Sequence, residues 1–181
     1  QSWDAGIEQG VWSDKISVGA TWFESEFDEM MDYDFISSRF ANVSEADIKG
    51  VEAELSFKPA DGFETRGTYT YTHTEDGDTG DELLRRPKDK YSLVLSYAGN
   101  DKMALNVSLI YMGKRNDVDP ASFATTRVQS HCLVNAGASY SVNNRLRCFV
   151  RVENLFDEDY EEVIGYGTAG VSGYGGIEIT L

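Results

Sequence analysis

The fold is decided by the end of the chain, which reads YGGIEITL from Tyr174 to Leu181 within the stretch Arg151–Leu181. Along this segment small or apolar residues alternate with larger or polar ones, and Tyr174, Glu178 and Thr180 belong to the second set. A period of two is typical of a strand whose two faces meet different environments, so the sequence predicts a terminal β-strand. Small or apolar residues occupy every second position here: Val171, Gly173, Gly175, Ile177, Ile179 and Leu181.

The same alternation recurs along the rest of the chain. Between Ile48 and Lys58, for example, Val51 and Leu55 share one face while Glu52 and Glu54 share the other. The pattern predicts an all-β, antiparallel meander of about nine strands, with one further strand piece at 35–43. The expected strands are 3–11, 16–22, 48–58, 63–72, 91–97, 103–111, 132–142, 146–152 and 171–181.

Connection lengths separate two kinds of β-protein. Short turns near residues 13, 60, 100 and 143 alternate with long loops at 24–47, 75–88, 113–130 and 155–170. Transmembrane barrels of the bacterial outer membrane have short turns on one side and long loops on the other, whereas soluble sandwiches mix connection lengths. The sequence therefore predicts a transmembrane β-barrel.

Aromatic residues on the apolar face follow the same division. If the protein were soluble, these side chains would simply cap strands around a core, and nothing would sort them by loop side. The sorting favours two aromatic belts at membrane interfaces. The belts comprise Trp22, Tyr71, Tyr91 and Tyr111 near the long loops, and Phe57, Phe63, Tyr97 and Tyr140 near the short turns.

Composition narrows the class of partner. The chain of 181 residues has a formal net charge of −15, which would repel nucleic acid or an anionic membrane surface. It contains no run of about 18 apolar residues, so no transmembrane helix is expected. A mean hydropathy of −0.39 is compatible with barrel strands, because their apolar and polar positions alternate.

Three blocks of sequence carry a family resemblance. They are Ile48–Glu52 (IKGVE), Leu83–Pro87 (LLRRP) and Val152–Asp157 (VENLFD), the last followed by Asp159 and Tyr160. These blocks resemble the C-terminal barrel of TonB-dependent outer-membrane receptors, with the cobalamin-transporter branch the most similar. Members form a barrel of about 22 strands around a plug, so residues 1–181 are expected to be the C-terminal portion, without plug or N-terminal strands. An odd strand count also favours a portion of a barrel.

The resemblance implies uptake of a large scarce nutrient, such as cobalamin or a ferric siderophore, and no enzymatic activity or cofactor. It implies outer-membrane lipid around the barrel, ligand contacts on the long loops, and contact with the TonB complex through the missing N-terminal part. The alternatives are a small self-contained barrel of structural or adhesive role, or an outer-membrane enzyme, for which two histidines supply no acid–base cluster. The terminal strand resembles the signal read by the barrel-assembly machinery at Gly176, Ile179 and Leu181, where Leu181 replaces the usual aromatic residue.

Basic residues gather where long loops meet the expected membrane rim. They are candidates for binding lipopolysaccharide phosphates or an anionic ligand through charge-assisted hydrogen bonds. The open alternative is pairing with the neighbouring acidic loops. The residues are Arg85, Arg86, Lys88, Lys90, Lys114 and Arg115.

The remaining polar candidates favour no bound metal. The acidic residues Glu75, Asp76, Asp78, Asp81 and Glu82 do not match a calcium loop, because Gly80 stands where a ligand is needed, so a solvated loop is expected. His73 and His131 have no second ligand at metal spacing. The predicted register places Cys132 and Cys148 over about 20 Å apart, so both are expected to be free thiols.

Overall fold

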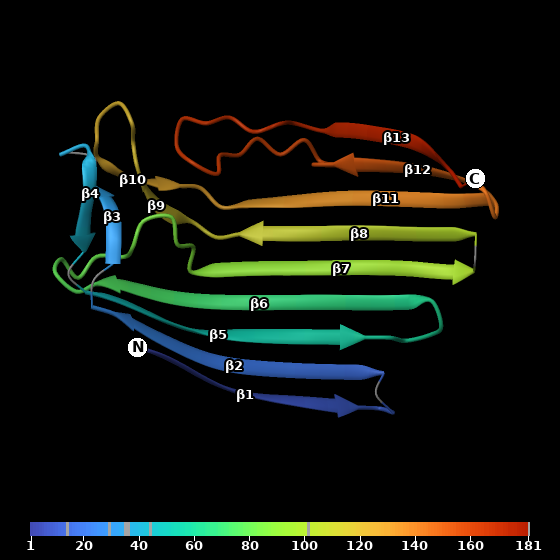
Figure 1. Ribbon diagram of the computed structural model, residues 1–181, viewed down its shortest axis with the longest axis horizontal. Helices are drawn as coiled ribbons and strands as arrows, with labels where there is room; N and C mark the ends of the chain where they lie inside the picture. Colours follow the sequence, from blue (N-terminus) through green and yellow to red (C-terminus); the bar gives the residue numbers. More distant parts are fainter. Residues whose placement is uncertain (14, 29, 35–36, 44, 101, 181) are drawn as a thin grey trace.

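The alternating segments form one nine-stranded antiparallel sheet in the computed structural model (Figure 1). The structure describes residues 1–13, 15–28, 30–34, 37–43, 45–100 and 102–180. The strand order β1-β2-β5-β6-β7-β8-β11-β12-β13 is the predicted meander, interrupted only by hairpins within loops. The sheet comprises β1 (Ser2–Val11), β2 (Ile16–Phe27), β5 (Ala46–Phe57), β6 (Phe63–Asp76), β7 (Asp89–Asn100), β8 (Met103–Met112), β11 (His131–Asn143), β12 (Leu146–Glu153) and β13 (Ser172–Ile179).

The register confirms the predicted division into two faces. Leu95 of β7 lies opposite Val107 of β8, and Leu105 of β8 lies opposite Ala138 of β11. The apolar face is exposed: Val150 is 58% and Ile177 is 67% accessible. Proteins in water rarely expose apolar side chains along one whole face of a sheet, so these exposed residues indicate that lipid covers this face.

The connections also sort by side as predicted. The short turns lie at one end of the sheet and the long loops at the other (Figure 1). At the short-turn end the rings of Phe63 and Tyr97 are 4.3 Å apart, and towards the long loops those of Tyr91 and Tyr111 are 5.5 Å apart. Neighbouring strands thus contribute adjacent members to each expected aromatic belt.

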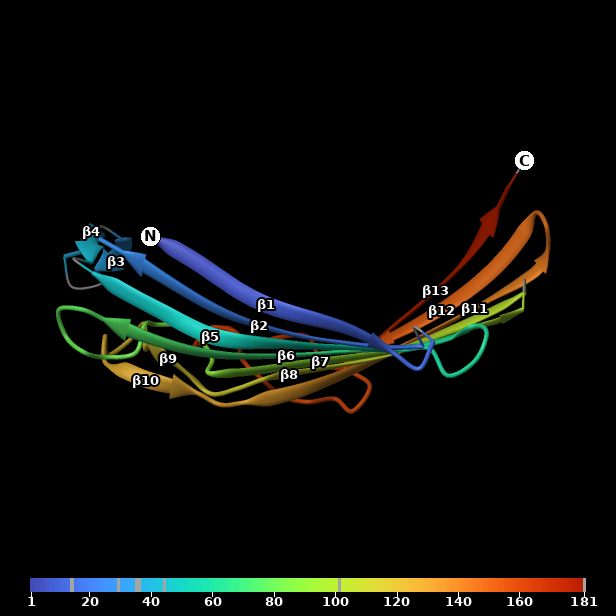
Figure 2. The same cartoon turned by 90° about the horizontal axis from the view of Figure 1, so that it is seen from below.

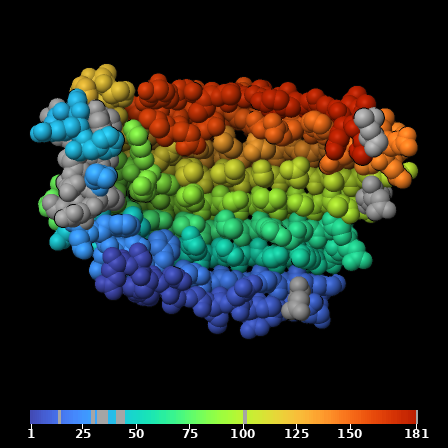
Figure 3. Space-filling view, in the orientation of Figure 1, coloured from blue at the N-terminus to red at the C-terminus, as the bar shows by residue number. Residues whose placement is uncertain are grey.

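The sheet is a single curved and twisted layer, seen from another side in Figure 2. Its visible face runs in sequence order from β1 at one edge to β13 at the other (Figure 3). Within the described residues, β1 pairs only with β2 and β13 only with β12. No helix in the described part of the chain is long and apolar enough to cross a membrane.

Two small hairpins stand at the long-loop end (Figure 1). The first joins β3 (Met30–Asp34) to β4 (Arg39–Val43), and the second joins β9 (Arg115–Val118) to β10 (Thr125–Val128). The expected strand piece at 35–43 is found at Arg39–Val43, while residues 35 and 36 lie outside the described residues. The sequence does not predict β3, β9 or β10, because they lie in polar loops without two-faced alternation.

Burial is concentrated at the long-loop end, because a single layer has no core between two sheets. Leu83, between β6 and β7, and Val128 of β10 are buried apolar residues there. Several polar side chains are equally buried, and all of them lie in long loops or at strand ends facing those loops. They are Thr74, Arg115, Asp117, His131 and Asn154.

Candidate functional site

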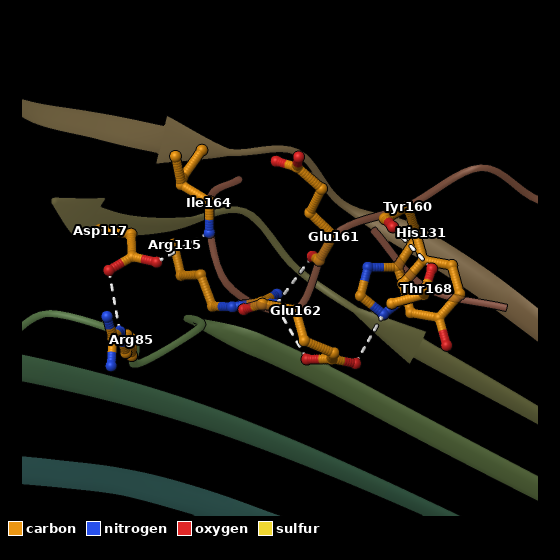
Figure 4. A network of polar contacts seen from close by, with 9 residues as sticks. All are labelled: Arg85, Arg115, Asp117, His131, Tyr160, Glu161, Glu162, Ile164 and Thr168. Atoms are coloured by element: carbon orange, nitrogen blue, oxygen red, sulfur yellow. Dashed lines mark hydrogen bonds and ion pairs between the residues drawn. The ribbon is translucent and has the colours of Figure 1, made fainter. Parts of the chain in front are cut away.

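Three long loops meet in one network of polar contacts (Figure 4). They are residues 77–88 between β6 and β7, 113–130 between β8 and β11, and 154–171 between β12 and β13. We call this network the loop cluster. Its members are Arg85, Arg115, Asp117, His131, Tyr160, Glu161, Glu162, Ile164 and Thr168.

Asp117 of β9 joins all three loops. Its side chain has 0% exposure, and its Oδ1 accepts hydrogen bonds from Arg85 Nε at 2.8 Å and from the Val118 backbone N–H at 2.9 Å. Its Oδ2 accepts the Ile164 backbone N–H at 3.1 Å. Burial raises the pKa of Asp117, but these hydrogen bonds and the Arg85 charge together lower the pKa below its ordinary value. The carboxylate is therefore held ionised.

Arg115 lies two residues before Asp117, so both side chains project from the same face of β9. Its Nη2 donates to the backbone oxygens of Glu161 and Glu162 at 3.2 and 2.7 Å and to the Glu162 carboxylate at 2.9 Å. The Arg115 residue is only 4% exposed. A guanidinium so deeply buried needs such charge-assisted bonds, which here fix the backbone of loop 154–171 to β9.

His131, the first residue of β11, completes the same contact. It is 3% exposed, its Nε2 lies 3.4 Å from the Glu162 carboxylate, and its ring lies 4.4 Å from that of Tyr160. The Glu162 carboxylate therefore contacts both Arg115 and His131. The contact holds the middle of loop 154–171 against the beginning of β11.

Asn154 shapes the beginning of that loop. Its φ of 50° is in the left-handed region, which asparagine tolerates better than most residues. Its backbone N–H donates to Asn135 Oδ1 at 2.9 Å, and its Oδ1 accepts the Glu158 N–H at 2.8 Å. Its Nδ2 donates to the backbone oxygens of Glu158 and Ala169 at 2.9 and 3.3 Å. One side chain thus ties the two ends of the loop together.

The basic residues singled out in the sequence have different environments. Arg85 pairs with Asp117, and Lys88 pairs with Glu82, whose hydrogen bond raises the pKa of Lys88. For Arg115 the expectation of a side chain open to lipopolysaccharide is wrong, because loop 154–171 buries this side chain. Arg85, Lys88 and Arg115 instead pair with acidic neighbours, which is the alternative interpretation of the sequence. Arg86, Lys90 and Lys114 are exposed.

The acidic residues at 75–82 mostly serve their own loop. Asp76 Oδ1 accepts the backbone N–H groups of Asp78 and Thr79, both at 3.0 Å. Gly80 has a φ of +72°, a conformation that suits glycine. Among the described residues, no group of three or more His, Cys, Asp or Glu side chains is arranged to hold a metal ion.

Cys132 and Cys148 are free, as the register predicts. Cys148 lies opposite Tyr140 of β11, whereas Cys132 lies opposite Tyr111 at the other end of that strand. The two thiols therefore sit near opposite ends of the apolar face, out of disulfide reach.

Gly176 and Ile179, two residues of the expected assembly signal, lie in the terminal strand β13. Gly176 lies opposite Phe149, and a Cβ added to Gly176 would lie 2.5 Å from Phe149 Cζ. A side chain at position 176 would therefore require the Phe149 ring to move. Ile179 is exposed on the apolar face, and Leu181 lies outside the described residues.

Sequence reasoning missed Asp117, His131 and Glu162 as members of one cluster. No motif connects them, because Arg115 reaches residues that are 46 and 47 positions away. The usable signal was the Asn154-Leu155-Phe156-Asp157 block, whose first residue organises loop 154–171. The charged groups of the cluster bind one another, so the arrangement positions loops.

Comparisons with known proteins agree with this architecture. A model of the β-barrel of TonB-dependent receptor-like proteins matches residues 1–155. The pyoverdine outer membrane receptor FpvA of Pseudomonas aeruginosa PAO1, solved bound to pyoverdine, has a TM-score of 0.80 at 22% identity, over 99% of this chain and 29% of that one. The ferric-catecholate import receptor Fiu of E. coli K12 in its closed form has a TM-score of 0.79 at 18% identity, over 98% and 27%.

The siderophore receptor PiuA of Acinetobacter baumannii is also similar, with a TM-score of 0.70 at 20% identity, over 96% of this chain and 26% of that one. This chain thus spans under a third of the length of these receptors. At such identities the structures establish the fold, and the match over residues 1–155 establishes the family. The chain therefore belongs to the TonB-dependent receptors, as part of the β-barrel that these proteins place in the bacterial outer membrane.

Proposed function

We propose that this chain is the C-terminal portion of a receptor barrel that imports a large scarce nutrient, with a ferric siderophore as the preferred class. The main support is the loop cluster, which builds an ordered surface from three long loops at one end of a lipid-facing sheet. One of the similar receptors binds pyoverdine and another imports ferric catecholates, which favours a siderophore over the cobalamin suggested by sequence motifs.

The proposed partners follow from the same architecture. Outer-membrane lipid would cover the apolar face, and the TonB complex would act through parts of the receptor outside this chain. The barrel-assembly machinery would read the terminal strand, including Gly176, Ile179 and Leu181. Among the basic residues near the expected membrane rim, Arg86, Lys90 and Lys114 remain candidates for binding lipopolysaccharide phosphates, because these three residues are exposed.

Uptake by cells tests the nutrient class. The receptor containing this chain is expressed in a bacterial strain without its own siderophore and cobalamin receptors, with and without TonB. We expect TonB-dependent accumulation of iron from ferric pyoverdine or a ferric catecholate. Accumulation of cobalamin but not iron would reverse the preference between the two classes, and uptake of neither would contradict the proposal.

A second measurement addresses the rim. Replacing Arg86 and Lys114 together with alanine is expected to lower the amount of lipopolysaccharide that copurifies with the receptor. The control is Arg145→Ala, which removes an exposed charge in the short turn between β11 and β12. Unchanged lipopolysaccharide in the double variant would remove these residues from the proposal.

A further inference from the structure

Strand β9 links loops that are distant in sequence. From one face of it, Asp117 binds Arg85 of loop 77–88 and the Ile164 N–H of loop 154–171. Arg115 binds the backbone of loop 154–171 two residues away, and the Arg85 backbone N–H donates to Asn116 O at 2.7 Å. Figure 4 shows Arg85, Asp117, Arg115 and Glu162 following one another across the cluster.

Burial makes these links interdependent. Asp117 is 0% and Arg115 is 4% exposed, and an unpaired charge at such positions is strongly unfavourable. If loop 154–171 lifted alone, Arg115 would lose its bonds to Glu161 and Glu162, and Asp117 would lose the bond from Ile164. Movement of loop 154–171 therefore removes hydrogen bonds from both buried charges. Loop 77–88 depends on Asp117 through Arg85, and loop 113–130 carries both charges.

We propose that Arg115 and Asp117 are positioning residues that hold loops 77–88, 113–130 and 154–171 as a single body. The inference rests on the proposed function for its consequence: a ligand meets an already ordered surface and does not need to order three loops separately. Ordering loops on binding costs affinity, so a surface ordered beforehand binds more tightly. The coupling itself does not depend on the identity of the ligand.

Hydrogen exchange of the ligand-free receptor tests the coupling directly. We compare the intact receptor with Arg115→Ala and follow the backbone amides of all three loops. We expect at least about tenfold faster exchange in each loop, because the opening of one loop exposes the others. This includes loop 77–88, although the side-chain bonds of Arg115 go to Glu161 and Glu162 of loop 154–171. Arg115→Lys keeps a charge that can reach Glu162, so it should restore part of the protection.

The matched control is Lys88→Ala. Lys88 pairs with Glu82 inside loop 77–88, so its removal breaks an ion pair without crossing between loops. Faster exchange should then stay within that loop. Heat-modifiable mobility of both variants on gels reports whether the barrel itself remains folded. If Arg115→Ala accelerates exchange only in loop 154–171, the three loops are not one body and the proposal fails.

Ligand uptake separates positioning from bulk stability. With ferric pyoverdine as the probe, Arg115→Ala should raise the half-saturating concentration about tenfold while the maximal rate at saturation stays the same. A fall in the maximal rate with unchanged half-saturation would contradict a positioning role. If the unmodified receptor takes up no ferric pyoverdine, this probe does not support the siderophore assignment, and hydrogen exchange alone decides the coupling.

Discussion

The carboxylate of Asp117 accepts a hydrogen bond from Arg85 Nε at 2.8 Å, although the two residues are 32 positions apart in the sequence. The other oxygen of the same carboxylate binds the Ile164 N–H, 47 positions further along the chain. A side chain with 0% exposure thus gathers donors from two loops onto a third. A single substitution at Asp117 would therefore affect all three loops.

Replacing Asp117 with asparagine tests this effect. The amide cannot accept both sets of donors, so Arg85 or Ile164 loses its partner inside a buried site. We expect a loss of about 1–3 kcal/mol in the local opening free energy of the loops. Native-state hydrogen exchange of Ile164 and its neighbours measures it. Asp119→Asn, whose carboxylate caps only the turn at Ala121 and Ser122, should leave Ile164 unaffected.

Acid should loosen the same loops. The hydrogen bonds to Asp117 outweigh burial and lower its pKa in the folded state, and backbone hydrogen bonds from Ser122 and Ala121 also lower the pKa of Asp119. A lowered folded pKa contributes stability that is complete above the unfolded value of about 3.9 and is lost as pH falls through the folded value. Loop protection should therefore be constant from neutral pH to about pH 5 and decline below about pH 4. Limited proteolysis across this range measures the decline, and Asp117→Asn should make it shallower, leaving the part that Asp119 contributes; an unaltered profile would contradict the assignment.

The sequence predicts the sheet well and the cluster poorly, for a physical reason. A shift of one residue would turn Leu95 from the apolar face to the polar one, so alternation fixes which face pairs with Val107, and the short turn between β7 and β8 fixes the rest of the register. The burial of Arg115 depends instead on Glu161 and Glu162, more than 40 positions away. No local period records such a contact, and an arginine in a polar loop is expected to be exposed.

Asn154 should tolerate replacement badly. It combines a φ of 50° with hydrogen bonds to Glu158 and Ala169, so alanine loses both the favoured conformation and the bonds. We expect Asn154→Ala to cost about 2–3 kcal/mol in the local stability of loop 154–171. Asn154→Gly retains the backbone conformation, so the difference between the two variants isolates the conformational part. Proteolytic cleavage rates within the loop measure both, and equal rates would show that the conformation contributes little.

The two thiols report which face meets lipid. Cys132 and Cys148 are free and lie on the apolar face, opposite Tyr111 and Ile177. In intact outer membranes a charged, membrane-impermeant maleimide should leave both unmodified, because the hydrocarbon of the lipid excludes the charged reagent. After denaturation both should react, and mass spectrometry of the peptides shows the modification. Labelling of Cys148 in intact membranes would place its face in water and contradict the barrel orientation.

Opposite faces of β7 should respond oppositely to the same charge. Leu95 lies mid-strand on the apolar face and is 44% exposed, whereas the adjacent Ser96 lies on the polar face. Leu95→Arg places a guanidinium in the hydrocarbon near the middle of the bilayer, which costs about 2–4 kcal/mol, because lipid offers no hydrogen-bond partner there. Ser96→Arg places the same group on the face with Asn106, its cross-strand partner, where polar neighbours can solvate it. We therefore expect Leu95→Arg to lower the unfolding stability of the refolded receptor in lipid vesicles and Ser96→Arg to leave it nearly unchanged. If both variants lose the same stability, the two faces do not differ in environment, and the assignment of lipid to the Leu95 face is wrong.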